Sequence, residues 1–129
     1  MRNAHSCKTS IVIVLLMFVA AAEALQAQDI MKLAPEGRTV LIENERVRMI
    51  ETVLKPGDKE PMHSHPAYIF YALTPMKVRV TLPDGKTTEA EFKAGEAAWR
   101  DGATHIGENI GTTEGRFLII ELKEPPKKK

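Results

Sequence analysis

The sequence has almost no cysteine. Its one cysteine, Cys7, stands near the start of the 129 residues and precedes an apolar run. A disulfide framework within one chain needs pairs of cysteines, so disulfides are excluded as the source of stability. Once the N-terminal leader described below is removed, no thiol remains. Stability must then come from the core, and a mechanism based on a cysteine nucleophile is excluded.

An excess of charge of either sign is also missing. Lysine and arginine together number 18, aspartate and glutamate 17, and the formal net charge is +1. This balance gives no electrostatic reason to expect nucleic-acid binding. The exception is the run of lysines within residues 124–129. We interpret it as a flexible, solvated basic tail rather than a docking site for phosphate or anionic lipid.

A hydrophobic run long enough to span a membrane is absent as well. The apolar run from Ile11 to Ala22 would form a helix of roughly 18 Å, whereas the hydrocarbon core of a bilayer is about 30 Å thick. Arg2 and Lys8 precede this run, and Ala22-Glu23-Ala24 supplies the small residues that a signal peptidase prefers, which is the pattern of a secretory signal. We therefore predict a signal peptide over residues 1–24, with an uncleaved anchor as the weaker alternative.

The predicted cleavage site defines the rest of the chain. Cleavage after Ala24 is favoured over cleavage after Ala27, because the latter puts Leu25 where a small residue is preferred. About 105 residues then remain, enough for one small domain. We expect an exported protein, periplasmic or secreted, with no stable membrane anchor after the signal is cleaved.

Sustained helical periodicity is absent after the predicted signal. Short runs rich in valine, isoleucine, threonine and aromatic residues recur instead, separated by glycine, proline and aspartate. The expected strands are 39–43, 47–54, 66–73, 77–82, 87–92, 96–99, 105–110 and 116–123. Asp84-Gly85 supplies the positive φ that a tight hairpin turn needs. We predict an all-β, single-domain antiparallel barrel or sandwich over residues 39–123, preceded by an N-terminal arm over residues 25–38.

Histidine is concentrated in one place. Of the four histidines, only His5 lies in the predicted signal, and the others are His63, His65 and His105. His63 and His65 alternate, so on a strand both point to the same face, and a third ring can come from a neighbouring strand. A lone histidine is more often a hydrogen-bonded core residue. Because neutral imidazole is the commonest metal-binding side chain, we predict that these three bind one divalent metal ion.

The residues around the histidines extend this pattern. It resembles the two motifs of the cupin family, which run Gly-x5-His-x-His and Gly-x5-Pro-x-Gly-x2-His-x3-Asn. The matching residues are Gly57, His63 and His65 in the first motif and Gly95, Gly102, His105 and Asn109 in the second. The gap after Gly95 is one residue short, and Arg100 stands where proline is usual. The resemblance covers residues 47–121. It implies a cupin-type antiparallel β-barrel, or jelly roll, that takes a small-molecule ligand or substrate and forms a homodimer.

One metal ligand of the family is missing. The resemblance places its glutamate at Ile69, or at Phe70 with a longer gap, and no acid lies between His65 and the turn at Thr74. Three neutral imidazoles leave the ion its full positive charge, which favours an anionic chelating ligand. Some cupin dioxygenases use three-histidine iron. The resemblance therefore implies an iron-dependent dioxygenase acting on a small chelating organic acid or diketone. Fe(II) is favoured, although Zn, Ni, Mn, Cu or Co also suits three histidines.

Several residues near the motifs are candidates for the wall of the site. Tyr68, Ile69, Tyr71 and Trp99 are expected to line the pocket, although aromatic residues on short strands are more often plain core. Asn109 is expected to bond the backbone or to orient a histidine rather than to touch metal.

Two other functions stay open. A non-catalytic periplasmic module that binds a small molecule or a metal ion fits the lack of a convincing acid or base beside the histidines, so no catalytic residue is assigned. A metal-assisted isomerase or lyase would need a base, for which Glu108 and Tyr68 are the only candidates. The segment from Leu25 to Gly37 is expected either to exchange between the subunits of the homodimer or to be disordered.

Overall fold

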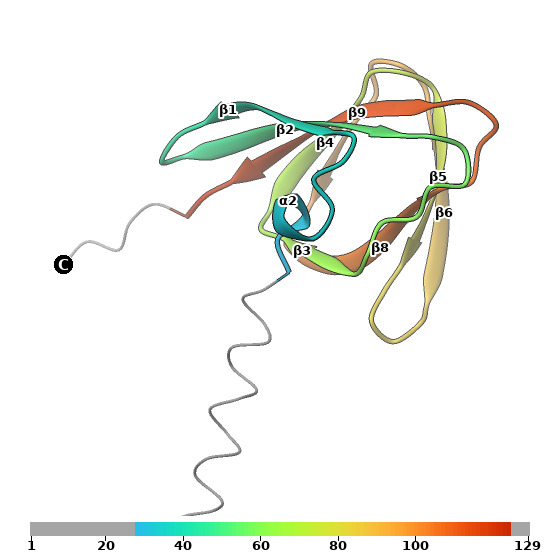
Figure 1. Cartoon of the computed structure of the whole chain (residues 1–129), viewed down its shortest axis with the longest axis horizontal. Coiled ribbons are helices and arrows are strands. Elements are labelled where there is room, and N and C mark those ends of the chain that lie inside the picture. Colours follow the sequence, from blue (N-terminus) through green and yellow to red (C-terminus); the bar gives the residue numbers. More distant parts are fainter. Residues whose placement is uncertain (1–27, 125–129) are drawn as a thin grey trace, which may run out of the picture.

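Two antiparallel sheets face each other and close into a barrel in the computed structural model, which describes residues 28–124 (Figure 1). The predicted signal peptide over residues 1–24 and most of the predicted basic tail lie outside the described residues. The elements, in chain order, are α2 (Ile30–Leu33), β1 (Arg38–Glu43), β2 (Val47–Leu54), β3 (His63–His65), β4 (Tyr68–Ala72), β5 (Met76–Thr81), β6 (Thr87–Phe92), β7 (Ala97–Arg100), β8 (Ala103–Asn109) and β9 (Gly115–Leu122). No helix within residues 28–124 is long and apolar enough to cross a membrane.

The order of the strands places the histidine-bearing elements in one sheet. The larger sheet has the order β1-β2-β9-β4-β7, and the smaller one has the order β3-β8-β5-β6. Neighbouring strands pair antiparallel throughout. The β5–β6 hairpin turns at Gly85, whose φ of 83° is a left-handed conformation that glycine adopts without strain. The prediction of an all-β antiparallel barrel is thereby confirmed.

The core lies between the two sheets, because alternation along the strands buries one face of each. In β4 and β9 every second side chain is buried. Five large members of the core cluster are Leu54, Phe70, Met76, Phe117 and Ile119. The ring of Phe70 lies 4.6 Å from the ring of Phe92 and 5.1 Å from that of Phe117. Full burial of a side chain of this size contributes about 1.5–3 kcal/mol, which gives the chain a stable core without disulfides.

The described part of the N-terminal arm packs against the barrel of its own chain. The backbone oxygen of Gln28 accepts a hydrogen bond from Ser64 N at 2.9 Å, and its side-chain Oε1 accepts one from Ser64 Oγ at 2.9 Å. Asp29 begins α2 by accepting a hydrogen bond from Met31 N at 3.0 Å. Ile30 is buried. The arm thereby reaches β3, the strand that carries the histidine pair (Figure 1).

Candidate metal centre

Pairing between β3 and β8 brings three imidazoles together. His63 is the register partner of His105 across the two strands. The strand alternation expected from the sequence puts His65 on the same buried face as His63. The metal-binding atoms of the three side chains all lie within 4.8 Å of one another. The structure therefore brings together the three histidines that the sequence picks out.

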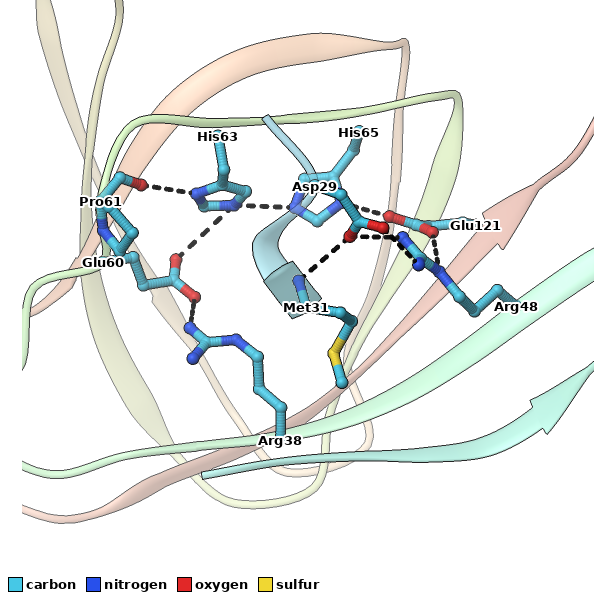
Figure 2. Close-up of polar contacts among 9 residues, drawn as sticks. All are labelled: Asp29, Met31, Arg38, Arg48, Glu60, Pro61, His63, His65 and Glu121. Atoms are coloured by element: carbon cyan, nitrogen blue, oxygen red, sulfur yellow. Dashed lines mark hydrogen bonds and ion pairs between the residues drawn. The ribbon is translucent and has the colours of Figure 1, made fainter. Parts of the chain in front are cut away.

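Hydrogen bonds fix which nitrogen of each β3 ring faces its neighbour. His63 Nδ1 lies 2.8 Å from the backbone oxygen of Pro61, and His65 Nδ1 lies 2.6 Å from Oε1 of Glu121 (Figure 2). Both partners are acceptors, so each Nδ1 carries the hydrogen and each neutral ring has its lone pair on Nε2. The two Nε2 atoms face each other at 2.9 Å.

This arrangement of lone pairs fits a bound cation. Two unprotonated nitrogens at 2.9 Å repel each other unless a positive charge lies between them. One ion can bind both, because two nitrogens that share an ion lie no farther apart than about 4.2 Å, twice the usual bond of roughly 2.1 Å. The two β3 nitrogens therefore fit a divalent metal ion. His105, whose ligand atom lies within 4.8 Å of theirs, can complete the set.

Burial keeps the rings in the form that binds metal. Burial and the neighbouring His63 and His65 rings lower the pKa of His105 to about 3. Burial also lowers the pKa of His63 below its ordinary value, although Glu60 opposes this shift. Both rings are therefore neutral at neutral pH, with a lone pair available to a metal ion.

We expect acid to weaken the metal-free fold before most carboxyl groups titrate. The unfolded chain protonates His105 below its ordinary pKa of 6.5, whereas the folded chain does so only near a pKa of about 3. As pH falls through that window, the free energy of unfolding should decrease by about 1.4 kcal/mol per pH unit for this residue. The contribution of His63 adds to this decrease, and above about pH 6.5 neither histidine makes stability depend on pH.

Urea denaturation of the protein with a metal chelator present, at about pH 7, 6 and 5, measures this dependence. The variant His105→Gln should show a shallower decrease, because it lacks one of the two rings whose pKa is lowered by burial. Equal stability of the unmodified chain at about pH 7 and 5 would contradict the expectation.

A chain of charged groups links His65 to the N-terminal arm. Arg48 Nε donates to Glu121 Oε2 at 2.6 Å, and the other end of the guanidinium donates to Asp29 at 2.9 and 3.0 Å (Figure 2). Burial alone would raise the pKa of the Glu121 carboxyl, but the hydrogen bonds from His65 and Arg48 outweigh it and lower the pKa. Glu121 therefore stays ionised. A carboxylate that accepts the Nδ1 hydrogen is the usual support of a metal-binding histidine, since it fixes the tautomer and orients the ring.

Glu60 and Glu121 correct the expectation that no acid lies beside the histidines. Glu60 Oε2 is 4.0 Å from His63 Nε2, and Glu121 bonds His65 directly. Both acids lie outside the interval in which the family's motif has its glutamate. Glu60 comes before the histidine pair, and Glu121 is on β9. A signal for Glu121 does exist in the sequence. It continues the alternation of the inward-facing Phe117 and Ile119 on β9, where an acid is out of place unless it has a partner.

A cavity of about 290 Å³ lies inside the barrel next to the histidines. Apolar residues make up much of its wall, including Ile50, Leu54, Val80, Phe92, Phe117 and Ile119. Its polar lining includes His65, His105, Tyr68, Glu60, Arg38 and Arg100. The ring of Tyr68 lies 4.8 Å from that of His65. Burial raises the pKa of Tyr68 to about 12, so its hydroxyl is a hydrogen-bond donor at neutral pH.

Three of the residues expected to line the pocket do not do so. Tyr68 lines the cavity, but Ile69 and Tyr71 alternate to the other face of β4. Trp99 is the register partner of Ile69, and its side chain is 54 % exposed. These residues lie in the right strands, and the alternation of the pleat points them outward. Glu108, considered as a base, does line the cavity, and it pairs with Arg79 at 3.4 Å.

Asn109 binds backbone rather than a histidine. Its Nδ2 donates to the backbone oxygens of Leu54 and Thr113 at 2.9 Å each, and its Oδ1 accepts from Gly111 N at 2.9 Å. The side chain is fully buried. Its place in the second motif is therefore structural, since it joins the end of β8 to β2 and to the turn that leads into β9.

We expect Asn109→Ala to destabilise the fold without changing the metal centre. The loss of three hydrogen bonds, one buried and two partly buried, should cost about 2–4 kcal/mol, because backbone groups are left without partners. Denaturant midpoints measure this loss, with the exposed Asn44→Ala as a control of smaller effect. Metal affinity should stay within about threefold of the unmodified chain. A larger fall would instead show that Asn109 acts on a histidine.

No protein-family model matches the chain, and no curated protein matches it. Solved structures do. A cupin domain of Bordetella pertussis Tohama I is similar with 30 % identity and a TM-score of 0.62, over 67 % of this chain and 92 % of that one. An RmlC-like cupin with a double-stranded β-helix fold from Methanocaldococcus jannaschii is similar with 20 % identity and a TM-score of 0.56, over 70 % and 82 %. A polyketide cyclase of Streptomyces resistomycificus is similar with 27 % identity and a TM-score of 0.52, over 69 % and 66 %.

Proposed function

The chain belongs to the cupin family, and we propose that it is a metal-dependent dioxygenase that acts on a small chelating organic acid or diketone. The observation that carries this proposal is the convergence of three buried histidines, His63, His65 and His105, beside a largely apolar cavity. Neutral nitrogens suit Fe(II), while Zn, Ni, Mn, Cu and Co remain possible.

The cavity supports a small, mostly apolar substrate with one anionic head. A volume of about 290 Å³ is at the lower end of the usual range for ligand pockets. The apolar wall would hold the body of the substrate and keep water away from it. Arg100 and the protonated Tyr68 hydroxyl lie in the same wall and would position an anionic oxygen. A bound divalent ion would supply a Lewis acid and a redox centre at this point.

Oxygen consumption tests the proposal. The purified chain is loaded with Fe(II), and in parallel with the other candidate ions, and oxygen uptake is followed with a panel of small diketones and α-keto or hydroxy acids. Uptake that depends on both metal and substrate is expected. Metal binding with ligand-induced thermal stabilisation but no turnover would replace the proposal with a non-catalytic binding module.

A metal-assisted reaction without oxygen is the second candidate. The similarity to a polyketide cyclase favours it, and so does the place of Glu108 in the cavity wall, because a base beside the site suits proton abstraction from an enolisable carbonyl compound. Loss of substrate under strictly anaerobic conditions, in the same panel, distinguishes this reaction from a dioxygenase.

Export and dimer formation are part of the same proposal. The predicted signal peptide lies outside the described residues, so cellular fractionation is the test of a periplasmic or secreted location. Sedimentation equilibrium of the processed chain tests the homodimer.

A further inference from the structure

Glu60 lies at the metal-facing nitrogen of His63. It belongs to the loop before β3, and its side chain is 9 % exposed. Its Oε2 atom is 4.0 Å from His63 Nε2, the same nitrogen that faces His65 at 2.9 Å (Figure 2). A carboxylate oxygen therefore lies near the metal-facing nitrogen of His63.

The backbone of β8 makes room for this carboxylate. Gly107 stands two residues after His105, so both face the same side of β8. A Cβ atom at position 107 would lie 2.2 Å from Glu60 Oε2, far inside contact distance. Glu60 N also donates to the backbone oxygen of Gly107 at 2.8 Å. This hydrogen bond holds the loop against β8. Glu60 occupies the space that a side chain at position 107 would need.

Arg38 holds only one of the two carboxylate oxygens. Its guanidinium pairs with Glu60 Oε1, and its side chain is 4 % exposed. The same guanidinium donates to the backbone oxygens of Ala34 and Glu36. Among the described residues, Oε2 has no hydrogen-bond donor of its own. A buried ion pair contributes little net stability, so stability alone does not explain why Glu60 is inside the barrel.

We propose that Glu60 is the fourth ligand of the metal ion, in place of the carboxylate that the family's motif would put at Ile69. This inference rests on the metal site of the proposed function. The 4.0 Å between Oε2 and His63 Nε2 does not exceed twice a metal–ligand bond of about 2.0–2.2 Å, so one ion can touch both atoms. The ligand set is then three neutral imidazoles and one anion. This set leaves the ion with less positive charge than three histidines alone. The carboxylate comes from the loop before β3 instead of from β4.

Binding of Co(II) to the purified chain is the first test. Glu60→Gln should weaken Co(II) affinity by more than about 100-fold, beyond the 10–100-fold typical of residues that only support a ligand. The visible absorption of the Co(II)-loaded protein should also change, since an oxygen ligand is lost. The matched control is Glu51→Gln, because Glu51 also pairs with an arginine, Arg116, but away from the site. It should leave affinity and spectrum unchanged.

Two further variants separate a ligand from a structural ion pair. Arg38→Gln keeps the carboxylate and removes the partner that orients it, so Co(II) affinity should fall by no more than the roughly 10–100-fold typical of a supporting residue. Gly107→Ala keeps both charged residues but displaces the carboxylate, so it should weaken Co(II) binding as much as Glu60→Gln does. It therefore tests the proposal even if Glu60→Gln folds poorly. If Arg38→Gln loses as much affinity as Glu60→Gln, or if Gly107→Ala loses none, the carboxylate is not a ligand. Failure of the unmodified chain to bind Co(II) would instead overturn the proposed function.

Discussion

Replacing His105 by alanine is expected to abolish useful metal binding, with a loss of affinity of more than about 1000-fold. His105 is the only one of the three histidines that comes from β8, and without it the ion keeps two nitrogens from one strand. Loss of a direct ligand should exceed the 10–100-fold that follows loss of a supporting residue. The measurement is competition with a chelator of known affinity, for Fe(II) and Zn(II).

The control for this variant is Tyr68→Phe. It alters the same cavity wall but removes only a hydroxyl, so metal affinity should change by less than about tenfold. His105→Ala enlarges the cavity and lowers stability, so its folding is checked by circular dichroism before binding is measured. Unchanged affinity in a folded His105→Ala protein would remove this histidine from the site.

The second large effect is expected for Glu121→Gln. The carboxylate accepts from His65 Nδ1 and from Arg48 Nε at 2.6 Å each. A glutamine side chain has only one acceptor oxygen, so its NH2 group must lie against one of these two N–H donors and cannot accept its hydrogen bond. His65 then loses the partner that fixes its tautomer. We expect metal affinity to fall by about 10–100-fold and stability to fall by about 1–3 kcal/mol.

Glu43→Gln is the matched control for this effect. Glu43 also accepts a hydrogen bond from a cationic side chain, Lys123 at 2.9 Å, but the pair is exposed. Its loss should change stability by less than about 1 kcal/mol and leave metal affinity unaltered. Chelator competition and denaturant midpoints give both quantities for each variant. A Glu121→Gln protein with unaltered metal affinity would show that the link to Arg48 is purely structural.

The barrel could be predicted because its signals are local. The predicted strands over residues 47–54 and 87–92 coincide with β2 and β6. Asp84-Gly85 marks the hairpin between β5 and β6, and the His-x-His alternation places both rings on the buried face of β3. Each of these features depends on neighbours within a few residues, where the pleat and turn chemistry decide the conformation.

The support around the site could not be predicted, because it depends on register between distant strands. Arg48 and Glu121 are register partners on β2 and β9, far apart in the sequence. The family's motif has its acid after the histidine pair, at the position of Ile69, whereas Glu60 precedes the pair. A pattern of residue types does not specify such pairings.

The buried arm has a consequence for whatever enters the barrel. Ile30 forms part of the cavity wall, and α2 is held to Arg48 through Asp29. A ligand that contacts Ile30 would stabilise the docked position of α2, and the docked α2 would in turn slow dissociation of the ligand. Thermodynamic reciprocity makes the two effects equal in free energy. Amide exchange at Ala34, whose N–H bonds the oxygen of Ile30 at 2.9 Å, would therefore report occupancy of the cavity without any assay of chemistry.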